Sequence, residues 1–186
     1  MRIIAGKYKG HHLVSFKADH IRPTTDRVKE TLFNKFQFDI EGSKCLDLFC
    51  GTGNLGLEAI SRGAAHVTFV EKNKKSILIT KENIQKLKVD SDSYNLVTAD
   101  VLDFLKRHSG ASFDIIFIDP PFTEKMADEV LMRLNESKCF HENTLIAIES
   151  STQETVKDDY GQLYRFDFRE YGDKVLSFYT PKKEDV

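Results

Sequence analysis

The stretch that decides the fold is LDLFCGTGNLGLEAI, residues 46–60. Gly51, Gly53 and Gly56 form the pattern G-x-G-x-x-G between an apolar run typical of a buried strand and a run with helical periodicity. Glycines at such positions allow a tight turn and let a ligand approach the backbone and the N-terminus of the helix. The stretch therefore predicts a strand–loop–helix unit that binds a ligand at its loop.

Acidic residues near this loop bear on the kind of ligand. Glu71 ends the next apolar run, twenty positions after Gly51, where a carboxylate can accept both hydroxyls of a ribose. Sites for NAD, FAD and S-adenosylmethionine all share this pattern. Asp47 would repel a dinucleotide pyrophosphate but suits the ammonium and sulfonium groups of S-adenosylmethionine, and its alternative role is to order the loop through backbone hydrogen bonds. Asp100 follows a further strand run and can either bond an adenine amino group or cap a helix.

Apolar runs and helical patterns alternate along the chain. The expected strands are residues 44–49, 66–71, 94–99, 113–119 and 144–149, and the helical patterns are residues 25–37, 54–63, 72–87 and 123–137. Thr25 or Asp26 is a plausible N-cap of the first helix, and Gly63 is a good stop for the second. Near-continuous apolar runs suit strands that are covered on both faces. The alternation predicts an α/β fold with a mostly parallel sheet and right-handed crossovers.

Both ends of the chain depart from this alternation. Residues 2–16 contain two short strand-like runs around Gly10 and predict a small hairpin. Residues 163–180 alternate polar and apolar side chains on both sides of the sequence YGD, which predicts an antiparallel hairpin at the edge of the sheet. We expect a single domain, with residues 1–24 as a hairpin extension and residues 25–186 as a Rossmann-like core.

The composition is that of a soluble globular protein, with 186 residues of which 40% are hydrophobic and 30% charged. No apolar stretch approaches the roughly 18 residues of a membrane span, and the N-terminus lacks the pattern of a secretory signal. We therefore expect a cytoplasmic protein that does not meet a membrane. Cys45, Cys50 and Cys139 form no CxxC pair and are expected to be buried free thiols, and the histidine spacing predicts no metal site.

Positive charge gathers at the N-terminus. Residues 1–29 hold seven Lys or Arg and two acids, a net charge of +5, whereas the whole chain has a formal charge of −2. Such an asymmetry suggests a basic face that can meet phosphates, although a solvated charged surface is the ordinary alternative.

A second motif is FDIIFIDPPF, residues 113–122. Asp119 ends an apolar strand run, and ligands of open α/β sheets bind outside the carboxyl ends of the strands. Pro120 and Pro121 remove two backbone donors and leave carbonyl acceptors in a stiff corner, with the ring of Phe122 beside them. Apart from this chemistry, the corner can be read as a stiff surface turn with a half-buried Phe.

Acceptors and an aromatic plane in one corner suit methylation of an exocyclic amine. The nitrogen lone pair of such an amine is delocalised into the base, so the amine is a poor nucleophile. Hydrogen bonds to Asp119 and the Pro120 carbonyl would orient the lone pair and stabilise the positive charge that develops on nitrogen. Phe122 can stack on a base that has left its surroundings.

The Asp-Pro-Pro-Phe corner after a glycine loop resembles the D/N-P-P-Y/F motif of amino-methyltransferases. Four stretches, residues 2–10, 21–34, 45–73 and 113–122, together resemble the RsmD family, bacterial 16S rRNA methyltransferases that modify the N2 amine of guanine 966. The resemblance covers nearly the whole chain, from Arg2 through the C-terminal hairpin. It implies a seven-stranded sheet with an antiparallel strand, an N-terminal hairpin that helps to hold RNA, and S-adenosylmethionine as methyl donor without a metal.

The resemblance also implies roles for individual residues. Those on cofactor positions are Asp47, Gly51, Gly53, Glu71 and Asp100, and those on the catalytic corner are Asp119, Pro120, Pro121 and Phe122. Those expected to contact RNA or order the site are Arg2, Lys7, Arg22, Thr24 and Arg27, with capping or pairing within its helix as the alternative for Arg27. This chain has His11 where the family often has Arg, Phe122 where Tyr is common, and Phe49 where many other methyltransferases have glycine.

The sequence therefore predicts an enzyme that methylates a guanine in 16S rRNA or the assembling small subunit, with a monomer as the default state. A DNA amino-methyltransferase is an alternative, although this chain has little room for a target-recognition region. An NAD-dependent oxidoreductase would leave the Asp119 corner unexplained. A noncatalytic RNA-binding assembly factor would keep the basic N-terminus and tolerate replacement of Asp119.

Overall fold

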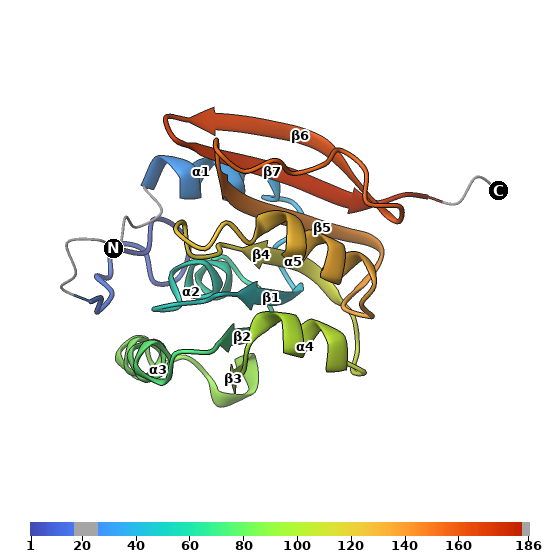
Figure 1. Ribbon diagram of the computed structural model, residues 1–186. Coiled ribbons are helices and arrows are strands. Elements are labelled where there is room, and N and C mark those ends of the chain that lie inside the picture. Colours follow the sequence, from blue (N-terminus) through green and yellow to red (C-terminus); the bar gives the residue numbers. More distant parts are fainter. Residues whose placement is uncertain (17–25, 184–186) are drawn as a thin grey trace.

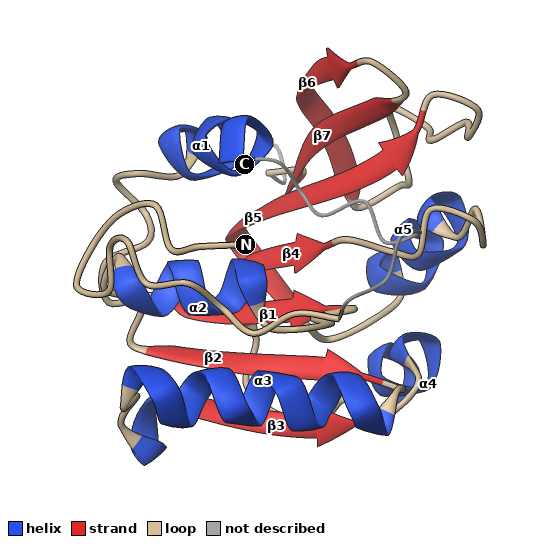
Figure 2. Ribbon diagram, turned by 90° about the vertical axis from the view of Figure 1, so that its left-hand side faces the viewer, coloured by secondary structure: helices blue, strands red, loops and turns tan. Residues whose placement is uncertain are grey.

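A computed structural model describes residues 1–16 and 26–183 of the chain. Its centre is a seven-stranded sheet in the order β3-β2-β1-β4-β5-β7-β6 (Figures 1 and 2). The strands are β1 (Lys44–Leu48), β2 (His66–Glu71), β3 (Tyr94–Thr98), β4 (Phe113–Ile118), β5 (Phe140–Ser151), β6 (Leu163–Tyr171) and β7 (Lys174–Pro181). Strands β1 to β5 pair in parallel, whereas β7 is antiparallel to both β5 and β6. The predicted α/β class and C-terminal hairpin are confirmed.

Helices cover both faces of the sheet, which is why the strand sequences are apolar on both sides. The helices are α1 (Asp26–Lys35), α2 (Asn54–Ser61), α3 (Lys74–Leu87), α4 (Val101–Arg107) and α5 (Ala127–Asn135), with a short 3-10 turn η1 (Ser91–Ser93). One core cluster joins α1, α2 and α3 to the sheet, and a second joins α4 and α5 to the opposite face (Figure 1). Within β1, Cys45 belongs to the first cluster and Leu46 to the second, as the two-residue period of a strand requires.

Two elements differ from the expectation. Strand β5 runs for 12 residues, longer than the predicted 144–149, because it pairs with β4 as far as Phe140 and with β7 as far as Ser151. Helix α4 was not predicted, because its seven residues are too few to show a clear helical period. Its N-cap is Asp100, a role that the sequence had left open.

The N-terminal segment does not confirm a two-stranded hairpin. Its cross-strand pairing is one isolated antiparallel bridge between Arg2 and His12. Three backbone hydrogen bonds accompany this bridge, from Leu13 N to Met1 O, from Ile3 N to His11 O and from Gly10 N to Ile3 O. The turn between the paired ends is bound by α2: Lys7 N donates to Ser61 O at 2.7 Å, and Tyr8 N donates to Ser61 Oγ at 2.9 Å. The segment therefore packs onto the end of α2, and residues 17–24 of the expected extension lie outside the described residues. None of the helices in residues 1–16 and 26–183 is long and apolar enough to cross a membrane.

Candidate active site

The glycine loop and the Asp119 corner lie side by side at the point where the strand order reverses. Strand β1 has β2 on one side and β4 on the other (Figure 2), and open α/β sheets bind ligands in the crevice that such a reversal leaves at the carboxyl ends of the strands. Leu48 and Ile118 are register partners in β1 and β4, and Asp119 N then donates to Leu48 O at 3.4 Å. The strand register thus brings together two motifs that are about 70 positions apart in the chain.

The loop after β1 has the backbone of a ligand-binding turn. Gly51 and Gly53 have positive φ angles of 54° and 83°, and a Cβ added at Gly51 would meet only Phe49 O, at 3.9 Å. The backbone beside Gly51 is therefore open to a ligand. Phe49 itself has φ 61°, a conformation that favours glycine, which accounts for the glycine found at this position in many methyltransferases. Thr80 Oγ1 donates to Gly51 O at 2.8 Å and fixes the turn against α3.

Gly56 allows α2 to pack closely against the sheet, and it does not serve the approach of a ligand. A Cβ at this position would lie 2.3 Å from Phe69 Cε1 and 2.9 Å from Val67 Cγ1 on β2. Helix α2 can therefore approach the sheet only because residue 56 has no side chain. The third glycine of the motif sets the angle at which the N-terminus of α2 meets the loop.

Asp47 orders the glycine loop through a backbone hydrogen bond, which was the alternative role considered for it. The side chain is 1% exposed, and its Oδ2 accepts a hydrogen bond from Gly56 N at 2.8 Å. The pKa of Asp47 is raised to about 8. Burial is the largest cause, the negative charges of Asp119 and Glu71 add to the rise, and the Gly56 N–H opposes it. A cation bound beside the loop would lower the pKa of Asp47 again. The expected contact of Asp47 with a cationic ligand stays a prediction.

Glu71 and Asp100 stand at the ends of β2 and β3, on the same edge of the sheet. Glu71 Oε2 accepts from Gly51 N at 3.2 Å, and its Oε1 accepts from Asn73 N at 2.8 Å. Asp100 Oδ1 accepts from Leu102 N at 2.9 Å as the N-cap of α4. Both acids are half-buried, so each combines a backbone contact with access to the crevice.

The corner after β4 is rigid at its start and exposed at its end. Pro120 is buried and Pro121 half-buried, whereas the ring of Phe122 is 45% exposed. A turn follows in which Glu124 N donates to Pro121 O at 3.0 Å. An exposed aromatic ring at this position is a surface on which a flat base can stack.

Some basic residues of the N-terminus that were expected to contact RNA already contact other side chains of the protein. Arg2 forms an ion pair of 2.9 Å with Asp26, and the Arg27 guanidinium lies 5.6 Å from the centre of the Tyr171 ring. The Lys7 ammonium lies 5.2 Å from the centre of the Tyr8 ring and is exposed. Arg22 and Thr24, which were also expected to contact RNA, lie outside the described residues.

One acid of the site was missed by the sequence reasoning. Glu149, near the end of β5, lines a small cavity together with Asp119. The signal was present, because the run TLIAIE ends in Glu149 just as HVTFVE ends in Glu71. The three cysteines are free and buried, as expected. Within residues 1–16 and 26–183, no group of three or more His, Cys, Asp or Glu side chains is arranged to hold a metal.

Comparison with known proteins gives close relatives. The family model described as conserved hypothetical protein 95 matches residues 1–180. The ribosomal RNA small subunit methyltransferase D of Haemophilus influenzae is 42% identical over 151 residues, which cover 81% of this chain and 78% of that protein.

Solved structures with the same fold include one named "Putative methyltransferase yhhF from Escherichia coli". It is 32% identical, with a TM-score of 0.84 over 99% of both chains. A more distant structure, described as "a putative methyltransferase complexed with SAH", is 20% identical, with a TM-score of 0.68 over 87% of this chain and 52% of that one. The second likeness concerns the fold alone.

Proposed function

Because this chain belongs to the RsmD family, whose model matches residues 1–180, we propose that it is an S-adenosylmethionine-dependent methyltransferase that acts on ribosomal RNA. The observation that carries the proposal is the hydrogen bond from Asp119 N to Leu48 O, which joins the Asp-Pro-Pro-Phe corner to the glycine loop. A methyl donor on the loop and an amine at the corner would then share one crevice.

The residues at the loop suit this donor. The backbone at Gly51 is open, and Glu71 ends β2 where the donor's ribose is expected. A cationic donor would favour the ionised form of Asp47, whose pKa is raised to about 8 without it. Gly53 and Asp100 complete the proposed cofactor-binding set. The donor supplies a methyl group on a positively charged sulfur, and the protein supplies its position.

The finer proposal is that the acceptor is the N2 amine of guanine 966 in 16S rRNA. Relatives named small subunit methyltransferase D support a substrate in the small subunit. The amine would donate hydrogen bonds to Asp119 and to the Pro120 carbonyl, and the exposed Phe122 ring would stack on the base. No covalent intermediate with the protein is needed, so positioning and electrostatics supply the catalysis.

The N-terminus is the proposed RNA-facing part. We propose that residues 1–24 form an extension that meets the RNA and that residues 25–186 form the catalytic core of one domain. Lys7 and Arg27 are exposed cations, and Arg2 would exchange its partner Asp26 for a phosphate. A monomer acting on the rRNA or the assembling small subunit in the cytoplasm completes the proposal.

The test is transfer of a labelled methyl group from S-adenosylmethionine to unmodified small-subunit RNA, both naked and protein-bound. The product nucleoside is identified by mass spectrometry. We expect N2-methylguanosine at position 966, formed by the natural chain and lost with Asp119→Ala.

Other results would point elsewhere. Methylated RNA with a different product nucleoside would keep the enzyme class and overturn the guanine target. Binding of S-adenosylmethionine without any RNA product would direct the search to DNA or protein amines. RNA binding without methyl transfer by the natural chain would favour a noncatalytic assembly factor.

A further inference from the structure

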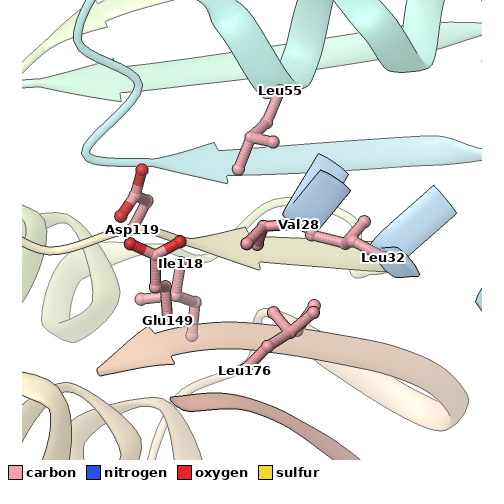
Figure 3. A pocket seen from close by; sticks show the side chains of 8 residues that line it. Val28, Leu32, Leu55, Ile118, Asp119, Glu149 and Leu176 are labelled. Atoms are coloured by element: carbon pink, nitrogen blue, oxygen red, sulfur yellow. The ribbon is translucent and has the colours of Figure 1, made fainter. Parts of the chain in front are cut away.

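Two carboxyl groups stand next to each other at the ends of β4 and β5. Ile118 and Ile148 are register partners in these parallel strands, so Asp119 and Glu149 follow at neighbouring positions. Figure 3 shows both side chains at the same end of one small cavity. Thirty positions separate the two acids in the sequence, and only the strand pairing joins them.

Glu149 is buried and only half paired. The residue is 8% exposed, and its Oε1 forms an ion pair with the Lys174 ammonium of β7. Its other oxygen, Oε2, is buried without a hydrogen-bond donor among the described residues. Buried polar atoms nearly always have a partner, so an orphaned carboxyl oxygen beside a proposed active site indicates a function.

The cavity that Glu149 lines is otherwise mostly apolar. Its volume is about 10 Å³, at the lower limit for holding one water molecule, and its other walls are mostly aliphatic. The side chains of Val28, Leu32, Leu55 and Leu176 supply much of this lining (Figure 3). In so little water, two carboxylates side by side cannot both remain charged easily.

The charges around Glu149 act in both directions. The pKa of Glu149 is raised to about 7, with burial as the largest cause and the charges of Asp119 and Asp173 adding to the rise. Lys174 acts in the opposite direction through its hydrogen bond and its charge. Asp119 comes from the corner after β4, Lys174 from β7 and Asp173 from the turn between β6 and β7. The residues of α1 and α2 that line the cavity are aliphatic.

We propose that Glu149 is a positioning residue that acts through Asp119, and that the two carboxyls together accept the proton released when the amine is methylated. This inference rests on the proposed function. Charged Glu149 makes Asp119 a stronger acceptor for the amine N–H, because a neighbouring negative charge increases the proton affinity of a carboxylate. Protonated Glu149 leaves Asp119 a weaker acceptor.

The proposed step balances. The nitrogen–methyl bond forms as the sulfur–methyl bond breaks. The electron pair of the broken sulfur–methyl bond stays on sulfur, which becomes neutral. One N–H bond then breaks, its electron pair returns to nitrogen, and the proton passes to Asp119 and is shared with Glu149, directly or through one water. Solvent removes the proton before the next turnover.

The experiment compares single-turnover methylation of small-subunit RNA by the natural chain and by Glu149→Gln, from pH 6 to pH 8. Gln keeps the shape and the acceptor for Lys174 but cannot ionise. We expect the natural rate to rise with pH through about 7 and the variant rate to stay flat. At pH 8 the variant should be about 10-fold slower, close to the natural chain at pH 6. Glu142→Gln, an exposed change on the same strand, should keep the natural profile.

If Glu149 had a structural role only, Glu149→Gln would lower the rate equally at every pH. That result, or a pH profile that is unchanged in the variant, overturns the inference.

Carboxyl ¹³C NMR of Glu149 tests the pair of carboxyls without RNA. The titration of Glu149 should move to lower pH in Asp119→Asn, and a titration that does not move also overturns the inference. A natural chain that binds S-adenosylmethionine but methylates no RNA overturns the proposed function instead. That failure is distinguishable, because a genuine pair still shows its Asp119-dependent titration.

Discussion

Lys29 and Glu58 form an ion pair of 3.0 Å between α1 and α2, and their side chains are only 1% and 0% exposed. The Lys29 ammonium also donates to Arg2 O at 2.7 Å, and Glu58 accepts from the backbone N–H groups of Ile4 and Ala5. The pair therefore joins two helices to the N-terminal segment that is proposed to meet RNA.

Replacing Lys29 by Met should lower the free energy of unfolding by up to about 3–5 kcal/mol. The cost arises because the buried Glu58 carboxylate would lose one of its two cations and keep only Arg62, at 2.8 Å. Arg2 O and Asn54 Oδ1 would also lose the Lys29 ammonium as a donor. Urea unfolding followed by circular dichroism measures the change.

Arg133→Met is the control, since it breaks an exposed pair with Glu136 that is worth at most about 1 kcal/mol. Equal losses in the two variants would contradict the prediction.

Gly56→Ala should destabilise the protein by about 1–3 kcal/mol, because the added Cβ would lie 2.3 Å from Phe69 Cε1 and force α2 away from β2. Thermal unfolding measures the loss. Gly110→Ala offers a matched comparison, because its Cβ would meet only the His108 side chain, at 3.1 Å. The interpretation of Gly56 as a packing glycine fails if the two variants have the same stability.

Asp47 should make stability depend on pH. Its pKa is raised from 3.8 to about 8, so the folded chain holds a proton that the unfolded chain releases above pH 4. The stability from this group is complete below about pH 4 and is lost as pH rises through 8. The free energy of unfolding of the natural chain minus that of Asp47→Asn should therefore fall from pH 5 to 8, by at most about 1.4 kcal/mol per unit. Urea titrations of both proteins at four pH values would show parallel curves if Asp47 ionises normally.

Phe122→Ala should reduce kcat/KM for RNA by roughly 5- to 150-fold, which corresponds to about 1–3 kcal/mol of lost base stacking. The ring is 45% exposed, so stability and S-adenosylmethionine affinity should hardly change. Phe122→Tyr should retain activity, because the ring face is kept. Phe38→Ala removes an even more exposed ring, at 91%, from the segment before β1 and should leave kcat/KM unaltered. Similar losses at both positions would argue against stacking by Phe122.

Much of the fold could be predicted from the sequence because its signals are local. Strand β2 begins and ends where the apolar run 66–71 does, and the glycine spacing identified the loop before α2. The short helix α4 was not predicted, because it lacks a clear helical period. The extra length of β5 was not predicted either, because it depends on pairing with strands elsewhere in the chain. The N-terminal hairpin was predicted from strand-like runs, but its pairing is limited to one bridge and a few backbone hydrogen bonds, and its turn is bound to Ser61.

The sequence by itself determined the strand–helix alternation, the glycine turn and the Asp119 corner, because periodicity and residue spacing act over a few positions. Only the tertiary structure decided that Asp47 holds Gly56 from within the core, and that Lys29 meets Glu58. It also decided that Asp119 has Glu149 as its neighbour, because that contact depends on the register of β4 against β5. Register and burial set the environment of each carboxyl, and that environment determines its proton affinity.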